Sequence, residues 1–503
     1  MRRALPIPVV AAALLPLLLP APGAAQTSET YDIVLAGGRV MDPETGLDAV
    51  RWVGIRGETV AAISDAPLEG RTVVDATGLV VAPGFIDLHA HGQSRRSNEF
   101  QAMDGVTTAL EMESGVPDME VFLAQRDGDA VVNYGATIGH GAVRTRIMPE
   151  YGAELEAALV ASRDVGQADA EAWMRLYDAA AAGRYDALDP AEYPALWERL
   201  EEGLRAGALG IGMPHQYYPA VTRDEIFRLF QFAADQGVPI YTHVREMGVA
   251  PIQEVVANAV ATGASLHVVH LNSSSLWDYR TNIDLILGAA ERGADITTEA
   301  YPYTAASTAL QSTIFDEGWQ DRLRISYGDV QWQDTGERLT EESFARYREE
   351  GGVVIIHMMK PEWIEAFMAD PRIMVASDGM PYAPGAHPRS AGTFARFLGR
   401  YVREDGVLPL MDALRKITLM PAQRLEGVAP QMRRKGRIQI GSDADLTVFD
   451  PRGIIDTATF EDGLSYSEGV EYVLVNGTFV VRDGALVEGA LPGRAVLGRG
   501  VVF

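Results

Sequence analysis

The sequence GFIDLHAH runs from Gly84 to His91. It begins as an apolar run of strand type and ends in two histidines that are separated by one residue. Because successive side chains of a strand point to opposite faces, His89 and His91 lie on the same face. Two imidazoles placed in this way can bind one metal ion. The stretch therefore predicts a strand that ends in a pair of metal ligands.

Short apolar runs alternate with longer helix-like stretches between about residues 83 and 435. This alternation is typical of a parallel sheet whose strands are connected by helices. We therefore expect an α/β fold with a TIM-like (β/α)8 barrel over residues 83–435. The expected barrel strands are Phe85–Leu88, Val106–Met112, Asn133–Ile138, Ala208–Met213, Pro239–Val244, Leu266–Leu271, Asp295–Tyr301 and Ile373–Ser377.

A ninth apolar run, Val353–Met358, exceeds the number of strands that this barrel needs. It follows a polar and aromatic stretch from about residue 304 to residue 350. We expect this stretch to be an insertion that folds over the mouth of the barrel.

Short strands divided by Gly, Pro and Asp are expected at both ends of the chain, over residues 26–82 and 436–503. In the second region, Asn476 and Gly477 separate two apolar runs, and this dipeptide favours a tight hairpin turn. We expect the two regions to pair into one small β-sandwich domain that is built from both chain ends.

The first 25 residues have the pattern of a signal peptide. Arg2 and Arg3 precede an apolar run from Val9 to Leu19, and small residues follow up to Ala25. This run is shorter than the roughly 20 apolar residues that span a bilayer, and prolines interrupt it. We therefore expect cleavage near Ala25, a secreted or periplasmic protein, and no stable membrane span after removal of the signal.

The composition excludes several classes of function. The chain has 503 residues, of which 47% are hydrophobic, so it can bury a large core. Its 43 basic and 69 acidic residues give a net charge of −26, which repels nucleic-acid phosphates, so no nucleic acid is expected as a partner. The absence of Cys excludes disulfides, thiolate metal sites and a Cys nucleophile. Any catalysis must use oxygen and imidazole groups.

Three more candidate ligands follow expected barrel strands. His243, His270 and Asp378 stand at the ends of the fifth, sixth and eighth strands. Reactive groups of a (β/α)8 barrel lie at the carboxyl ends of its strands, so we expect these side chains to converge with the first histidine pair. The histidines that we expect to be structural are His140, His215, His267 and His357.

Two divalent ions held by four imidazoles need a bridging anion between them. A carboxylated lysine on the fourth strand is excluded, because the three lysines, Lys360, Lys416 and Lys435, lie elsewhere in the sequence. The second strand instead ends with Glu111 and Glu113 on one face. We favour Glu113, which is nearer the rim, as the bridge and keep Glu111 as the alternative.

Imidazole and carboxylate ligands fit zinc best, although manganese, cobalt and iron are also compatible. Two such ions would lower the pKa of a bridging water and polarise a carbonyl group. Asp378 would hold one ion and act as the catalytic residue that takes the proton from the water and passes it to the leaving amine. The expected reaction is amide hydrolysis by a metal-bridging hydroxide, without a covalent intermediate.

These motifs resemble those of the amidohydrolase superfamily, and most closely those of its D-aminoacylase (N-acyl-D-amino-acid deacylase) branch. The resemblance covers nearly everything after residue 25. Besides GFIDLHAH, it rests on Gly105–Thr108, Tyr241–Arg245, Ala300–Tyr303, Ser377–Gly379, His387–Arg389 and Pro421–Leu425. It implies that Arg389 binds the carboxylate of an N-acyl amino acid. It also implies that Tyr301 or Tyr303 holds polar atoms of the substrate.

The chain differs from this branch at two positions. Ser114, next to Glu113, stands where the branch usually has a bridging Cys. Asn272 stands where the branch usually has a Lys, two residues after the sixth-strand histidine. The resemblance therefore implies a changed metal bridge, and it places Asn272 beside the substrate at a position where a cation is usual.

The resemblance and the candidate ligands together predict a metal-dependent enzyme that hydrolyses carbon–nitrogen bonds other than peptide bonds. An N-acyl-D-amino acid is the favoured small-molecule substrate. The alternatives are ring opening of a cyclic amide, such as a hydantoin or a dihydropyrimidine, and cleavage of a dipeptide-like amide. An inert binding protein is least favoured, because all five expected metal and base residues are present. A homo-oligomer is compatible with the sequence.

Overall fold

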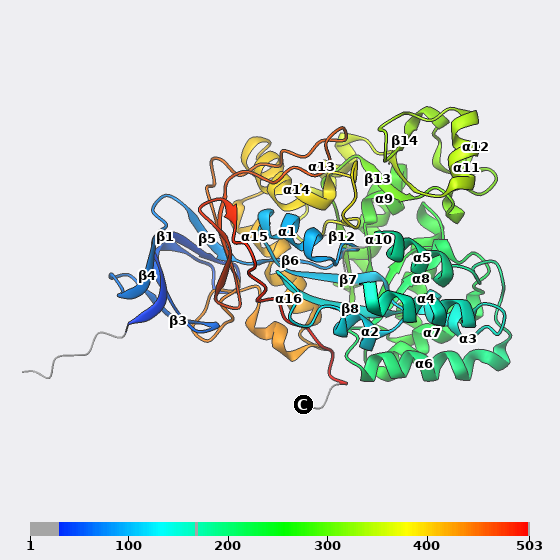
Figure 1. Cartoon of the computed structure of the whole chain (residues 1–503), viewed down its shortest axis with the longest axis horizontal. Coiled ribbons are helices and arrows are strands. Elements are labelled where there is room, and N and C mark those ends of the chain that lie inside the picture. The colour runs from blue at the N-terminus through cyan, green and yellow to red at the C-terminus, as the bar shows by residue number, and fades with distance from the viewer. Residues whose placement is uncertain (1–29, 166–169, 501–503) are drawn as a thin grey trace, which may run out of the picture.

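The structure is a computed structural model that describes residues 30–165 and 170–500. The expected signal peptide, residues 1–25, lies outside these ranges. Figure 1 shows a region of β-strands at one end of the molecule and an α/β barrel at the other. The strands of the barrel position the candidate site.

Eight strands form one parallel sheet in which each strand pairs with the next barrel strand along the chain. Each overlaps one of the eight expected strands, so the predicted (β/α)8 barrel is confirmed. The strands are β6 (Phe85–Asp87), β7 (Val106–Val116), β8 (Asn133–Gly139), β9 (Ile211–Pro214), β10 (Ile240–His243), β11 (Leu266–Val268), β12 (Ile296–Ala300) and β16 (Met374–Val375).

The first and last barrel strands meet through the segments that follow them. Ala90, after β6, forms a parallel bridge with Gly379, after β16. The buried carboxylate of Asp87 accepts hydrogen bonds from N and Oγ of Ser377, at 3.0 and 2.5 Å, and from N of His89 at 3.1 Å. These contacts join the two ends of the sheet, so the residues that follow β6 and β16 lie side by side.

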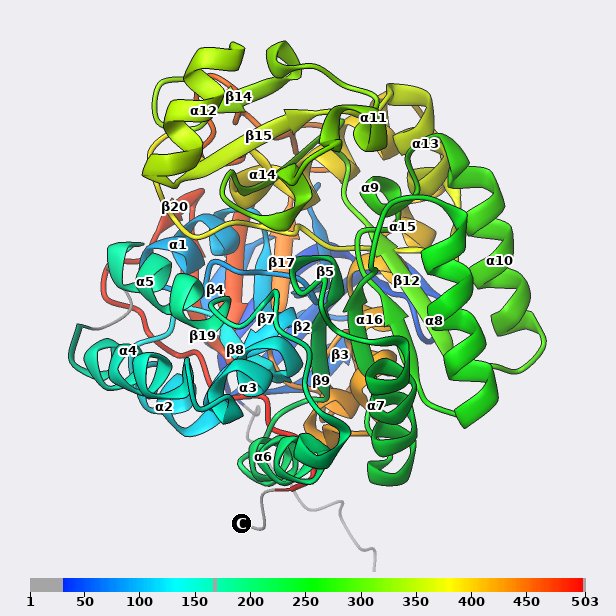
Figure 2. The same cartoon turned by 90° about the vertical axis from the view of Figure 1, so that its right-hand side faces the viewer.

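Helices lie around the outside of the barrel strands, as Figure 2 shows. Within the described ranges, no helix has both the length and the apolar character needed to cross a membrane. The helices that connect or follow the barrel strands are α1 (Arg95–Met103), α2 (Met119–Ala124), α3 (His140–Ile147), α4 (Gly152–Val165), α5 (Ala170–Ala180), α6 (Tyr193–Arg205), α7 (Arg223–Gln236), α8 (Val249–Thr262), α9 (Leu271–Ser275), α10 (Tyr279–Glu291), α13 (Pro361–Ala369), α14 (Arg389–Arg396), α15 (Leu410–Ile417) and α16 (Leu419–Leu425).

A second, nine-stranded sheet contains strands from both ends of the chain. Antiparallel pairing of β17 with β5 joins the two parts, which lie side by side as blue and red strands in Figure 1. The strands expected at the two chain ends therefore pair in one sheet, which we call the β-domain, and the β-sandwich expected there stays a prediction. Its strands are β1 (Tyr31–Asp42), β2 (Leu47–Arg56), β3 (Thr59–Ser64), β4 (Gly70–Asp75), β5 (Val80–Pro83), β17 (Leu446–Phe449), β18 (Val470–Val475), β19 (Thr478–Arg482) and β20 (Ala485–Leu486).

Local turn chemistry explains two details of this sheet. Asn476 and Gly477 connect β18 to β19 with φ angles of 48° and 75°, the left-handed conformations that a two-residue hairpin turn needs. The expected hairpin is confirmed. In β1, the strand continues through Gly37, whose φ of 69° accommodates a shift of register before Gly38.

The insertion between β12 and β16 forms its own three-stranded antiparallel sheet in the order β13, β15, β14. The ninth apolar run of the sequence is β15, and its central position in this sheet accounts for its apolar character. The insertion therefore extends beyond residue 350, where we expected it to end. Its elements are β13 (Ala305–Ala309), α11 (Trp319–Leu323), β14 (Val330–Trp332), α12 (Glu341–Glu350) and β15 (Val353–His357).

One apolar core is shared by the barrel and the β-domain. It includes Phe85 and Ile211 of the barrel strands, Phe230 of α7, and Val473 and Val480 of the nine-stranded sheet, all of them buried. Burial of such side chains is the main favourable contribution to folding. The β-domain therefore stabilises the barrel rather than standing apart from it.

Asp87→Ala is expected to lower the free energy of unfolding by about 2–3 kcal/mol, because it leaves the buried N–H groups of His89 and Ser377 without an acceptor. The midpoint of thermal unfolding, followed by circular dichroism, measures the effect. Ser377→Ala removes a hydroxyl that donates to Asp87 and accepts from N of Gly379, but it leaves the carboxylate of Asp87 in place. It is the matched control, with an expected cost of about 1–2 kcal/mol. An unchanged midpoint for Asp87→Ala would show that these contacts do not hold the barrel closed.

Candidate metal centre

The six side chains that the sequence assigned to metal binding lie together at the carboxyl ends of the barrel strands. All of them are buried except His91, which is partly buried. They come from five of the eight strands or from the segments directly after them. They are His89 and His91 after β6, Glu113 on β7, His243 at the end of β10, His270 after β11 and Asp378 after β16.

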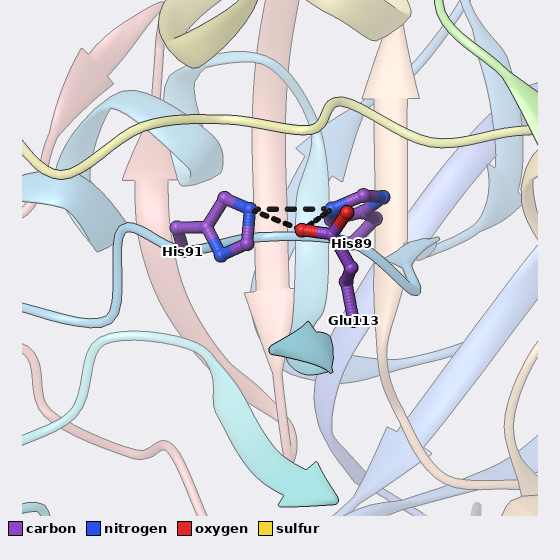
Figure 3. Close-up of side chains that lie close together, drawn as sticks. All are labelled: His89, His91 and Glu113. Atoms are coloured by element: carbon purple, nitrogen blue, oxygen red, sulfur yellow. Dashed lines mark hydrogen bonds and ion pairs between the residues drawn. The ribbon is translucent and has the colours of Figure 1, made fainter. Parts of the chain in front are cut away.

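The carboxylate of Glu113 lies between two pairs of imidazoles. Its Oε2 is 3.4 Å from Nε2 of His89 and 3.2 Å from Nε2 of His91, the arrangement drawn in Figure 3. Its Oε1 is 2.8 Å from Nδ1 of His243 and 2.9 Å from Nε2 of His270. Each oxygen therefore faces one pair of imidazoles, which is the geometry required of a carboxylate between two cations.

We call His89, His91 and Glu113 the first donor group. The Nε2 atoms of its two histidines are 3.3 Å apart, and Oδ1 of Asp378 lies 3.4 and 3.5 Å from them. Together with Oε2 of Glu113, these atoms have five spacings between 3.2 and 3.5 Å. Four ligands arranged tetrahedrally at zinc–ligand distances of about 2.0–2.1 Å are about 3.3–3.4 Å apart. The group therefore fits an ion of this size.

Glu113, His243 and His270 form the second donor group. Their ligand atoms all lie within 4.8 Å of one another, and all three residues are buried. Two imidazoles and a carboxylate are suitable ligands for zinc and for other first-row divalent ions. Because Glu113 belongs to both donor groups, the residues present fit a pair of ions that share one carboxylate.

The outer ring nitrogen of each histidine has its own hydrogen-bond partner. A partner that accepts a hydrogen bond keeps the proton on the outer nitrogen and leaves the inner lone pair free for a metal ion. The contacts are Nδ1 of His89 to Glu299 at 2.6 Å, Nδ1 of His91 to Glu111 at 2.7 Å, Nε2 of His243 to Oε1 of Gln216 at 2.7 Å, and Nδ1 of His270 to Oγ of Ser274 at 3.1 Å.

Sequence reasoning missed Glu299 and treated Glu111 as an alternative bridge. Glu111 instead lies behind His91 and accepts a hydrogen bond from N of Ser114 at 3.2 Å. Of the two glutamates on β7, Glu113 is the one that contacts both imidazole pairs. Glu299 is the only charged residue of its strand, β12, and strand alternation can direct its side chain into the barrel interior. These two features could have identified it from the sequence.

Carboxylates dominate the electrostatics of the cluster. Burial alone would lower the pKa of His89, but the charges of Asp378 and Glu299 raise it well above its ordinary value. Burial alone would raise the pKa of Glu113, but its hydrogen bonds with the imidazoles lower it well below the ordinary value. The cluster therefore favours positive charge among its imidazoles, whether that charge comes from protons or from metal ions.

Two of the six residues have an unfavourable backbone conformation. His270 has a φ of 31° and Asp378 a φ of 52°, both in the left-handed region that residues other than glycine rarely adopt. Such residues cost about 1–3 kcal/mol each and persist where the surrounding structure holds them in place. They occur preferentially at functional sites, which agrees with their position at the strand ends.

Arg389 lies behind Asp378 and is 1% exposed. Its Nη2 is 2.9 Å from Oδ1 of Asp378 and donates to the carbonyl of Ser307 at 3.4 Å, while its guanidinium lies 4.9 Å from the ring centre of Tyr301. Within the described residues, Nε and Nη1 of Arg389 and the hydroxyl of Tyr301 have no hydrogen-bond partner. Buried donors without partners are suited to a bound anion.

Asn272 joins this group, but Tyr303 does not. Nδ2 of Asn272 donates to the carbonyl of Tyr301 at 3.3 Å, and its Oδ1 has no partner in the described part of the chain. The hydroxyl of Tyr303 instead donates to the carboxylate of Asp456 at 3.4 Å, in the segment before β18. The structure therefore brings together three of the four expected substrate-binding residues and directs Tyr303 elsewhere.

A cavity opens onto the cluster. One end is lined by His91, Glu113 and Asp378, and the insertion and α5 contribute to its walls. Among the described residues that line it, none is a Lys or an Arg. Its apolar wall side chains include Leu176, Met247, Ala309, Ile314, Ile356 and Met358.

The amidohydrolase family matches residues 72–481 of the chain. N-acyl-D-glutamate deacylase of Alcaligenes xylosoxydans xylosoxydans is 32% identical, over 90% of this chain and 94% of the relative. D-aminoacylase of the same organism is 28% identical, over 91% and 96%. A solved structure with a similar fold is that of N-acyl-D-glutamate deacylase from Bordetella bronchiseptica, complexed with zinc and a phosphonate inhibitor. Its TM-score to this chain is 0.76 at 25% sequence identity, and the match covers 93% of this chain and 100% of that chain. With its barrel and its histidine–carboxylate cluster, this chain belongs to the amidohydrolase family.

Proposed function

We propose that this protein is a binuclear metal-dependent hydrolase that removes the acyl group from N-acyl-D-amino acids. The observation that carries the proposal is the position of Glu113, with one carboxylate oxygen toward each pair of imidazoles. The names of both relatives, a D-aminoacylase and an N-acyl-D-glutamate deacylase, support this class of substrate. The signal-peptide pattern of residues 1–25 supports a secreted or periplasmic location.

The first donor group with Asp378 would hold one ion, and the second donor group would hold the other. Zinc is the favoured metal, because imidazole and carboxylate ligands at tetrahedral spacing suit it. When bound, the two ions would polarise the scissile carbonyl and lower the pKa of the attacking water. The carboxylates around the imidazoles would offset the charge of the ions within the buried site.

Asp378 is the catalytic residue of this proposal. Its carboxylate borders both the first donor group and the cavity, so it can take a proton from water there and pass it to the leaving nitrogen. Burial alone would raise the pKa of Asp378, but the charge of Arg389 holds it below the ordinary value. Asp378 is therefore ionised and ready to accept a proton at neutral pH.

Arg389 and Tyr301 do not line the cavity, but Arg389 contacts two of its lining residues, Asp378 and Ser307. From this position the two side chains would hold the carboxylate of the substrate. Either of the free Nε and Nη1 of Arg389 can donate a hydrogen bond, and the positive charge of the guanidinium attracts a carboxylate. The free hydroxyl of Tyr301 adds a third donor. Asn272 offers an amide oxygen in this region, which can accept a hydrogen bond but does not supply a second positive charge.

The walls of the cavity favour a substrate with an uncharged side chain. A second carboxylate on the substrate would be buried against apolar residues such as Met358 and Ile356, without a Lys or an Arg among the described lining residues to pair with it. N-acyl-D-amino acids with apolar side chains are therefore favoured over N-acyl-D-glutamate and N-acyl-D-aspartate.

A substrate panel tests this function. Zinc-loaded protein is offered N-acetyl-D-leucine, N-acetyl-D-glutamate, the corresponding L forms and a set of hydantoins, and the released products are measured. The D-leucine derivative should be hydrolysed about tenfold or more faster than the D-glutamate derivative, because the cavity leaves a second carboxylate unpaired. Removal of the metal with a chelator should abolish the activity and zinc should restore it. Activity confined to the cyclic amides would contradict the proposal.

Asp378→Asn should reduce kcat on the order of a thousandfold, because the amide cannot accept the proton of the water. The thermal midpoint should stay close to that of the wild type, which shows that the fold is retained. Asp456→Asn changes a carboxylate on the far side of Tyr303 and is the matched control, with kcat expected to change less than about threefold. Wild-type turnover in Asp378→Asn would remove this residue from the mechanism.

A further inference from the structure

Glu299 links the candidate metal centre to the interior of the barrel. Its Oε1 accepts a hydrogen bond from Nδ1 of His89 at 2.6 Å, and its Oε2 lies 3.2 Å from Nε2 of His267. Nδ1 of His267 is in turn 2.7 Å from Oγ1 of Thr297. His89, Glu299 and His267 are each 1% exposed or less. The result is a buried chain of hydrogen bonds that crosses from β6 to β12 and β11.

This chain determines which nitrogen of His89 can bind a cation. A carboxylate is an obligatory acceptor, so the proton of the imidazole must be on Nδ1. The lone pair is then on Nε2, which faces Oε2 of Glu113 at 3.4 Å and Oδ1 of Asp378 at 3.4 Å. The negative charge of Glu299 also makes the imidazole a stronger donor to a metal ion.

The carboxylate of Glu299 is held in place by His267, through the oxygen that does not contact His89. Its two oxygens contact two different imidazoles, so the carboxylate cannot rotate without losing one of them. Thr297 lies on the same face of β12, two residues before Glu299, and holds the outer nitrogen of His267. His267 was expected to be a structural histidine, and its contacts with Thr297 and Glu299 agree with a structural role.

We infer that Glu299 is a positioning residue that keeps the Nε2 lone pair of His89 directed at the metal centre, and that His267 holds Glu299 in place for this task. The inference rests on the proposed function, because it requires metal ions at the donor groups. It goes beyond that function by assigning a role to Glu299 and His267, which belong to neither donor group and do not line the cavity.

The test measures metal affinity rather than activity alone. The zinc content and the zinc dissociation constants of the wild type, Glu299→Gln and Glu299→Asp are determined by competition with a coloured chelator. Glu299→Gln keeps the size of the side chain and removes its charge, so one of the two ions should bind roughly 10–100-fold more weakly and the other should keep its affinity. Glu299→Asp keeps the charge and should recover part of the loss.

Asp104→Asn is the matched control. Asp104 is another buried carboxylate, which accepts hydrogen bonds from N of Phe394, N of Ala395 and Oγ of Ser467, outside both donor groups. Its substitution should lower stability and leave both zinc affinities unchanged. A loss of zinc in Asp104→Asn equal to that in Glu299→Gln would attribute the effect to stability alone and would overturn the inference.

A second variant covers the case in which Glu299→Gln does not fold. His267→Phe keeps an aromatic ring beside Tyr241 but cannot donate to Glu299, and it should weaken the same ion roughly tenfold. Two tightly bound ions in the wild type, with the same affinities in the variants, would overturn only this inference. A wild type without tightly bound zinc would instead contradict the proposed function.

Discussion

The structure depends on one buried carboxylate. Glu113 is 4% exposed, and a charge at such a position is unfavourable unless other groups compensate for it. The compensation comes from four imidazoles that approach its two oxygens in pairs. These imidazoles belong to three different parts of the barrel, after β6, at the end of β10 and after β11. The carboxylate can therefore be accommodated only when the strands are correctly assembled, and this links the fold to the chemistry of the site.

The barrel explains how residues that are far apart in the sequence meet. Its parallel strands all end at the same rim, and the contacts of Asp87 with Ser377 bring the last strand beside the first. As a result Oδ1 of Asp378 lies 3.4 Å from Nε2 of His89. The residue before Asp378, Ser377, is 288 positions after His89 in the sequence. The insertion contributes apolar side chains to the wall of the cavity, so the same cavity is bordered by the charged cluster and by apolar residues.

Much of this arrangement could be predicted from the sequence. The eight strands have a clear apolar pattern, and the rule that reactive groups follow barrel strands identified His243, His270 and Asp378. The contacts behind the histidines could not be predicted, because they depend on side-chain directions inside the barrel. Strand periodicity placed Glu111 and Glu113 on one face, and the position of Glu113 nearer the rim favoured it as the residue between the imidazole pairs, which is where it lies. The extent of the insertion was missed because β15 reads like a barrel strand.

The most direct test of the central claim is the crystal structure of the zinc-loaded protein, with anomalous diffraction data collected at the zinc edge. We expect two anomalous peaks, one among His89, His91 and Asp378 and the other between His243 and His270, with one oxygen of Glu113 at each. A single peak that Glu113 does not contact, or zinc bound only outside this cluster, would contradict this claim.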